Sequence, residues 1–255
     1  MSRTSLHHAA DRQRADGLSE RTVSERLRVW HHFRTTTNTH PRDAHPDHAE
    51  LWWETLSRRS PATRATYLSA LRSYYKTTGL PDPTTDLRRP RMPHYMPRPL
   101  SDRQLAQAFR IGGDVGVWIH LAGMLGLRCV EIAALTPDSV TEDGLLRVDG
   151  KGDRVRFLPI TGEVGRVLAG YGWPRVSAKA VSRMVGRALR KAGVDATAHQ
   201  LRHTAATRFL RSSGYDLAAT SRLLGHASVA TTMVYAATDV RRTAEVLARM
   251  DDEVA

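Results

Sequence analysis

The chain has little cysteine, no long apolar stretch and little lysine. It has one cysteine, Cys129, among 255 residues, so it can form no internal disulfide. It has no stretch of about 18 apolar residues and no signal peptide, so we expect a cytoplasmic protein. Lysine is scarce as well, with only four among the 38 basic residues. Arginine supplies nearly all of the positive charge, so a lysine at a conspicuous position suggests a task other than carrying charge.

A strong positive charge is what the sequence does have. The formal net charge is +12 at neutral pH. Such an excess favours polyanionic partners, and double-stranded DNA is the leading candidate. A basic protein of the membrane surface is the alternative, but no membrane segment supports it. The length leaves room for two modest domains.

One segment, from Ala198 to Tyr235, carries side chains that can grip and attack a phosphodiester. His199 and Arg202 lie one turn apart at the start of a predicted helix and can face one ligand. A second predicted helix, from Asp216 to Leu224, is followed at a turn by His226. Two short helices around a glycine-containing turn are also typical of a helix-turn-helix DNA reader. This segment alone leaves both interpretations open.

A second cluster lies upstream, in the apolar segment from Val117 to Leu135. Its spacing predicts one buried core helix, interrupted by Arg128 and Glu131. Burying an unpaired charge is costly, so Arg128 requires an anionic partner. That partner is either Glu131, three residues on, or a phosphate held by two hydrogen bonds from the guanidinium.

Between these clusters the sequence predicts a β-hairpin. Two short runs of alternating residues, 145–148 and 154–158, flank a glycine-rich turn with Lys151 at its tip. A lysine at such a tip is ordinarily a solvated surface residue. Because lysine is scarce here and, unlike arginine, can readily give up a proton, Lys151 is also a candidate general acid.

No arrangement of the 12 histidines predicts a metal site. His199 and His203 have the spacing of a zinc-binding helix, but HQLRH lacks the glutamate that a metalloprotease places after the first histidine. The histidines between positions 31 and 48 have no regular spacing and no accompanying cysteine, and we interpret them as solvated basic surface. We expect no metal and no other cofactor.

Taken together, these motifs resemble those of the tyrosine recombinases, also called phage-type integrases. The resemblance extends over residues 19–250 and rests on G-L-R-C-V-E, the lysine of G-K-G-D-R, H-Q-L-R-H-T-A-A-T, L-L-G-H and the terminal tyrosine. It implies an enzyme that cuts and rejoins DNA strands through a 3′-phosphotyrosyl intermediate and a Holliday junction. The resemblance implies that Arg128 and Arg202 form a phosphate clamp, that Lys151 is the general acid and that Tyr235 is the nucleophile. It implies a base or hydrogen-bonding role for His199 and an accessory acidic role for Glu131. His226 occupies a catalytic position at which the family has His or Trp.

The predicted fold is mainly α-helical with a small β-hairpin, in two domains. Residues 1–17 are expected to form a flexible arm, and helices beginning near Ser19, Asp47 and Ser60 to form a helical domain over 18–86. The proline- and arginine-rich stretch that follows is typical of an extended linker, assigned to 87–98. A mixed α/β catalytic domain is assigned to 99–238. By resemblance, the helical domain binds core DNA and the two domains form a C-shaped clamp.

Four arginines in or beside the linker are candidates for contacts with backbone phosphates: Arg88, Arg89, Arg91 and Arg98. A mere spacer is the equal alternative. The resemblance further implies a tetramer on DNA, in which residues 239–255 are exchanged between protomers.

The biological role that the resemblance favours is the integration and excision of a phage or mobile element in a bacterial host. Residues 1–17 leave no room for the arm-binding domain of larger phage integrases, so we expect a simple integrase that recognises core-type attachment sites. A recombination directionality factor is a further expected partner. An Xer-like role in resolving chromosome dimers needs the same two domains and is one alternative. A helix-turn-helix regulator without catalysis is another.

Overall fold

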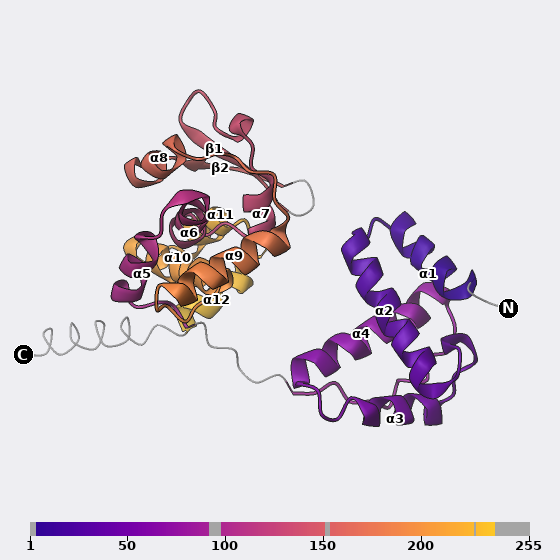
Figure 1. Ribbon diagram of the computed structural model, residues 1–255. Helices are drawn as coiled ribbons and strands as arrows, with labels where there is room; N and C mark the ends of the chain where they lie inside the picture. Colours follow the sequence, from indigo (N-terminus) through magenta and orange to yellow (C-terminus); the bar gives the residue numbers. More distant parts are fainter. Residues whose placement is uncertain (1–3, 92–97, 151–153, 227, 238–255) are drawn as a thin grey trace, which may run out of the picture. The chain divides into compact units, whose positions relative to one another are not determined.

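The computed structural model describes residues 4–91, 98–150, 154–226 and 228–237 (Figure 1). Contacts divide the chain into two compact units, with the boundary between residues 95 and 96. Both units are mainly helical, and the sheet found in the described residues is one antiparallel pair of strands, as the predicted fold class requires. No helix in this part of the chain is long and apolar enough to cross a membrane.

The first unit is helical, and its caps are local features of the sequence. Ser19 and Ser60 each accept a hydrogen bond from a backbone N–H of the first turn, and Gly79 ends a helix with φ +73°. The predicted helix starts are therefore confirmed. The elements are α1 Thr4–Ala15, α2 Glu20–Thr37, η1 Pro41–Asp43, α3 Pro46–Thr55 and α4 Pro61–Thr78.

Aromatic side chains make the core of this unit. Trp30 and Trp52 are fully buried, and each indole N–H has an acceptor. Trp30 Nε1 donates to the carbonyl of Ala70 at 2.7 Å, and Trp52 Nε1 lies 3.0 Å from His32 Nδ1. Large rings with satisfied N–H groups fix the packing of α2, α3 and α4.

The expectation of a flexible arm at residues 1–17 is wrong for the residues that the structure describes. Residues 4–15 form α1, which buries Leu6, Ala9 and Ala10 in the aromatic core. Gln13 Nε2 also donates to Thr77 Oγ1 at 2.8 Å. The apolar stripe of α1 consists mostly of alanines, which are too small to give a clear periodic signal against the polar residues around them.

The interpretation of the histidines between positions 31 and 48 as solvated surface is also wrong for His32 and His40, which are partly desolvated. Besides the bond between His32 and Trp52, His40 Nδ1 accepts a hydrogen bond from the N–H of Arg42. His48 Nδ1 accepts one from the N–H of His45, which satisfies a group at the start of α3. These imidazoles cap helices and support the core.

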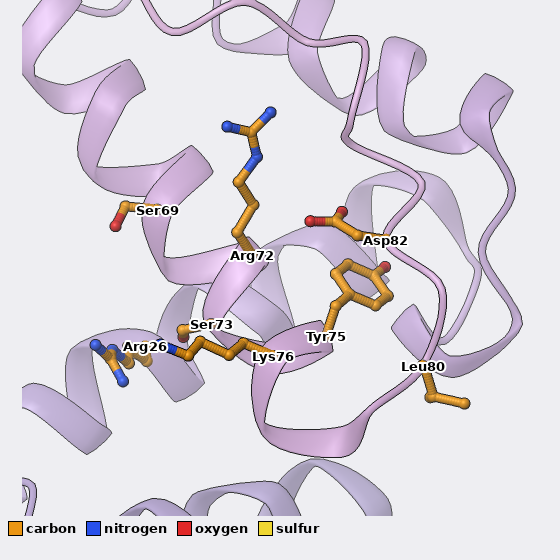
Figure 2. Close-up of a pocket in the computed structure, with 8 residues that line it drawn as sticks. All are labelled: Arg26, Ser69, Arg72, Ser73, Tyr75, Lys76, Leu80 and Asp82. Atoms are coloured by element: carbon orange, nitrogen blue, oxygen red, sulfur yellow. The ribbon is translucent and has the colours of Figure 1, made fainter.

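The chain after α4 folds back onto that helix, at the end of the helical domain assigned to 18–86. Arg72 holds it with three hydrogen bonds: one to Thr84 Oγ1, one to the carbonyl of Thr84 and one to that of Leu87. Thr84 is fully buried. Figure 2 shows Arg72 and Asp82 among the residues that line a pocket beside α4. This segment is fixed by an arginine on the preceding helix whose acceptors include two backbone carbonyls, which a sequence pattern does not reveal.

The second unit is built around α6, whose sequence is apolar on every side. Residues 116–123 of α6 are all buried, and α5, α7, α8, α9 and α10 pack on it (Figure 1). The elements are α5 Asp102–Phe109, α6 Gly113–Met124, α7 Cys129–Ala134, η2 Pro137–Ser139, β1 Leu145–Asp149, β2 Val155–Pro159, α8 Gly162–Ala169, α9 Ala178–Lys191, α10 Ala198–Ser212, α11 Leu217–Leu224 and α12 Ala230–Ala237.

The predicted β-hairpin is confirmed. β1 and β2 pair antiparallel from Leu145 opposite Pro159 to Asp149 opposite Val155, and the N–H of Gly150 donates to the carbonyl of Arg154 at 2.7 Å. Lys151 and the two residues after it lie outside the described residues.

The prediction of one helix over Val117–Leu135 is wrong. The helix ends at Met124, Gly126 takes a left-handed conformation with φ +67°, and α7 begins at Cys129 with Arg128 as its N-cap. The apolar pattern continues through the turn because Leu125 and Leu127 are both buried, and this conceals the break. As a result Arg128 stands at the start of a helix and not inside the core.

We expect Gly126→Ala to destabilise the second unit more than Gly144→Ala does. Both glycines have positive φ, +67° and +72°, so alanine costs about 1–2 kcal/mol at each. A Cβ at Gly126 would also lie 2.7 Å from Leu224 Cδ2, whereas nothing lies within 4 Å of one at Gly144. Urea denaturation of the two variants measures the difference. Equal losses of stability would mean that the chain accommodates the contact with Leu224 freely.

Candidate active site

A buried carboxylate organises the site. Glu131 lies in the first turn of α7, and its side chain is 2% exposed. Oε1 accepts hydrogen bonds from Nη1 of Arg128 at 2.9 Å and Nη1 of Arg156 at 3.0 Å. Oε2 accepts from the backbone N–H of Arg128 at 2.8 Å and Nη2 of Arg156 at 2.9 Å. Burial alone would raise the pKa of Glu131, but the hydrogen bonds from Arg156 and the Arg128 N–H outweigh it and hold the pKa below its usual value.

Arg156 is a residue that the sequence analysis missed. It comes from β2, forms a two-point pair with Glu131, and donates from Nε to the carbonyl of Leu223 at 3.0 Å. It therefore ties the hairpin to α7 and α11. A signal was present, since Arg156 and the buried Leu158 share one face of a strand with period two. A charge on the inward face of a strand indicates a buried partner.

Arg128 and Arg202, expected to form a phosphate clamp, meet at the end of α11. Arg202 Nη2 donates to the carbonyl of Leu224 at 2.9 Å, and Arg128 Nη1 lies 3.4 Å from the same oxygen. Arg202 Nη1 also donates to the carbonyl of Gly126 and lies 3.9 Å from Glu131 Oε2. Burial, followed by the charge of Arg128, lowers the pKa of Arg202 to about 10, so it stays charged at neutral pH. The Arg128 side chain is 38% exposed and is thus the arginine that solvent can reach.

The two histidines expected at the site also lie near these arginines. His199 stands in the first turn of α10 and remains exposed, and partial desolvation and the charges of Arg202 and Arg128 lower its pKa. His226 follows α11, and its Nδ1 lies 2.8 Å from Thr232 Oγ1. Burial and the same arginines lower the pKa of His226 to about 4, which keeps it neutral at physiological pH.

Tyr235 comes to this cluster from α12. Its ring is 5% exposed and packs with Ala206, Leu210 and Leu224. Its hydroxyl lies 2.9 Å from Nδ1 of His203, a contact that the sequence analysis did not foresee. His203 directly follows Arg202 on α10, so this contact brings Tyr235 to the part of α10 that carries Arg202.

The structure thus brings six of the residues proposed from the sequence into one cluster: Arg128, Glu131, His199, Arg202, His226 and Tyr235. Lys151 lies outside the described residues. The linker arginines Arg88, Arg89, Arg91 and Arg98 are all exposed. In the part of the chain that the structure describes, no group of three or more His, Cys, Asp or Glu side chains is placed to hold a metal ion.

Glu131→Gln should lower the free energy of unfolding by about 3–5 kcal/mol at neutral pH, because it leaves Arg156 and Arg202 as buried charges without a carboxylate. The folded-state pKa of Glu131 is depressed, so its stabilising effect is present above the unfolded pKa and is lost as pH falls through the folded one. The difference between wild type and variant should therefore shrink on acidification. Urea denaturation at several pH values measures it.

The matched control is Asp102→Asn, which breaks the exposed pair of Asp102 with Arg208. An exposed pair contributes about 1 kcal/mol or less. A loss in Glu131→Gln no larger than in this control, or one that does not change with pH, would contradict the electrostatic role of Glu131.

Comparisons with known proteins place this site in a family. The model of the phage integrase family matches residues 173–242. The tyrosine recombinase XerC of Pseudomonas aeruginosa (strain LESB58) is 33% identical over 222 residues, which cover 76% of this chain and 72% of XerC.

Solved structures agree on the fold. A lambda integrase dimer bound to a COC′ core site matches with a TM-score of 0.75 and 16% identity over 91% of this chain and 94% of that one. A lambda integrase tetramer bound to a Holliday junction matches with a TM-score of 0.72 and 16% identity over 88% and 77%. The likeness to these two shows the fold, and the likeness to XerC shows the family. This chain belongs to the tyrosine recombinases and is a site-specific recombinase, an enzyme that cuts and rejoins DNA strands.

Proposed function

We propose that this recombinase cleaves DNA by attack of the Tyr235 hydroxyl on a phosphodiester held between Arg128 and Arg202. The observation that carries the proposal is the meeting of the two guanidiniums at the carbonyl of Leu224. Among the described residues, the hydrogen bonds of the Arg128 guanidinium are made by Nη1. Its Nε and Nη2 can therefore bind a phosphate while Nη1 stays on Glu131.

The cluster suits the charge that develops during phosphoryl transfer. Negative charge builds on the non-bridging oxygens in the transition state, and fixed donors stabilise it without having to reorganise. Arg202 is held by two backbone carbonyls and Arg128 by a carboxylate. His199 and His226, with lowered pKa values, are neutral imidazoles that can donate further hydrogen bonds from a ring N–H.

The proposed reaction conserves the energy of the broken bond. The Tyr235 oxygen forms a bond to phosphorus, the bond from phosphorus to the 5′ oxygen breaks, and the 3′ phosphate stays on the enzyme as a phosphotyrosyl ester. Lys151 protonates the departing 5′ oxygen. A 5′ hydroxyl from a partner strand can then reverse the step, so strand exchange needs neither ATP nor a metal.

The proposed partners follow from this chemistry and from the relatives. The substrate is double-stranded DNA with core-type sites, and the exposed arginines Arg88, Arg89, Arg91 and Arg98 contact its backbone. The helical unit serves as the core-binding domain. Four protomers act together on a Holliday junction and exchange their C-terminal segments, residues 239–255, which lie outside the described residues.

For the biological role, we propose integration and excision of a phage or mobile element in a bacterial cell, assisted by a directionality factor. Resolution of chromosome dimers is the second candidate role. The similarity to XerC over most of both chains supports this candidate. Mapping the ends of a mobile element around the gene separates the two.

Tyr235→Phe should abolish formation of a covalent protein–DNA adduct and leave site binding nearly unchanged, because only the nucleophilic oxygen is removed. A nicked suicide substrate followed by a denaturing gel measures the adduct, and a mobility-shift assay measures binding. The reactions contain excess EDTA, since the proposed mechanism uses no metal. An adduct in the Tyr235→Phe reaction would show that another residue attacks.

Lys151→Ala should slow cleavage of an ordinary phosphodiester by about 10² to 10⁴, the usual contribution of a general acid. A sulfur in place of the bridging 5′ oxygen should restore the rate, because a thiolate leaves without a proton. The same substrate should not rescue Arg128→Ala, whose guanidinium acts on the non-bridging oxygens. Equal rescue of both variants, or of neither, would refute the role of Lys151 as the acid.

A further inference from the structure

We propose that His203 is a further catalytic residue, which holds the Tyr235 hydroxyl and accepts its proton during cleavage. The inference rests on the proposed role of Tyr235 as the nucleophile. The phenol must lose its proton as it attacks. The resemblance left His199 as either a base or a hydrogen-bonding group, and this inference gives the base's task to His203 and leaves hydrogen bonding to His199.

The geometry places His203 at the reacting oxygen. His203 lies on α10 directly after Arg202 and one turn after His199, and α12 packs against this helix. Nδ1 of His203 is 2.9 Å from the Tyr235 hydroxyl, and the ring centroids are 5.5 Å apart. This is the distance at which a general base takes a proton. The rings of His199 and His203 meet edge to face with centroids 4.2 Å apart, which limits the rotation of His203.

Burial shields this contact from competing water. His203 is 7% and Tyr235 5% exposed. The ring of Tyr235 is packed by Ala206 and Leu210 on α10 and by Leu224 on α11. Inside such a packed cluster a proton donor and acceptor stay aligned, and their bond is stronger than it would be in water.

The protonation state also suits a base. Within the described residues, the charged and titratable groups that bear on His203 include His199 and Arg202 on its own helix and Tyr235 on α12. Burial, followed by His199 and Arg202, lowers the pKa of His203 to about 4. The imidazole is therefore neutral at physiological pH, and Nδ1 can accept the hydroxyl proton when the other ring nitrogen carries the hydrogen. A bound phosphate brings negative charge to Arg202 and so raises this pKa, which makes His203 a stronger base once DNA is in place.

The proton balance is closed. In cleavage the O–H bond of Tyr235 breaks, an N–H bond forms at Nδ1 of His203, and the oxygen bonds to phosphorus while Lys151 gives its proton to the 5′ oxygen. In rejoining, the attacking 5′ hydroxyl gives its proton to the neutral Lys151 as its oxygen bonds to phosphorus, and the imidazolium of His203 returns a proton to the Tyr235 oxygen as the phosphotyrosyl bond breaks. His203 thus acts as base in one direction and as acid in the other.

The test is His203→Asn in the full-length protein, assayed for single-turnover cleavage of the nicked suicide substrate over a range of pH. Asparagine can hold the hydroxyl but does not take its proton, so cleavage should slow by about 10² to 10⁴ while site binding is unchanged. The wild-type rate should fall as pH drops through the pKa of His203, between the value in the free protein, about 4, and the ordinary value, 6.5. The variant should lose this dependence and gain rate at alkaline pH, where the phenol ionises by itself.

Leu210→Ala is the matched control, because Leu210 packs in the same cluster and cannot carry a proton. A lower rate with the wild-type pH profile is expected there. The same behaviour in His203→Asn, or a wild-type rate, would overturn the assignment of His203. An adduct formed by Tyr235→Phe would instead overturn the proposed nucleophile, so the two failures are distinguishable.

A second measurement covers the case in which His203→Asn does not fold. A fluorinated tyrosine at position 235 of the otherwise unchanged chain is a more acidic phenol and needs a base less. Its cleavage rate should therefore depend less on pH below neutrality than that of the wild type. An unchanged dependence would overturn the proposal.

Discussion

The buried carboxylate of Glu131 is the interaction on which the rest of the site depends. Three guanidiniums from three different elements converge within reach of one another, and in the absence of an anion they would repel. Glu131 offsets one of their charges and binds Arg128 and Arg156 directly. Arg156 in turn joins β2 to the end of α11, so the hairpin and the proposed phosphate clamp are linked by the same carboxylate. Three guanidiniums and one carboxylate leave the cluster with a net positive charge, which suits the proposed binding of a phosphodiester.

The same positive charge sets the protonation states around it. Arginines beside His203 and His226 add to the effect of burial and hold both imidazoles neutral before DNA binds. An incoming phosphate has the opposite effect, because its negative charge reduces the repulsion between an imidazolium and the guanidiniums. In the proposed mechanism, substrate binding and proton transfer are therefore coupled through electrostatics.

Features of the fold that depend on a few neighbouring residues could be predicted from the sequence. The serine caps of α2 and α4, the glycine that ends α4 and the alternating strands of the hairpin each follow from local chemistry. The failures have physical reasons too. The stripe of α1 is built from alanines, which give a weak periodic signal, and the break at Gly126 is concealed because the leucines on either side are buried. The fold of the segment from Asp82 to Leu87 depends on Arg72, which lies on the preceding helix, so no pattern within the segment itself indicates it.

The order and spacing of Arg128, Lys151, His199, Arg202, His226 and Tyr235 are determined by the sequence, and they were sufficient to indicate the family and its chemistry. The tertiary structure alone decided which groups support these residues. Arg156 reaches Glu131 across 25 positions, and His203 reaches Tyr235 across 32. Both contacts join separate elements, so they depend on how strands and helices pack. A charged residue in a strand or a second histidine on a helix has no recognisable partner until packing places one within hydrogen-bond distance.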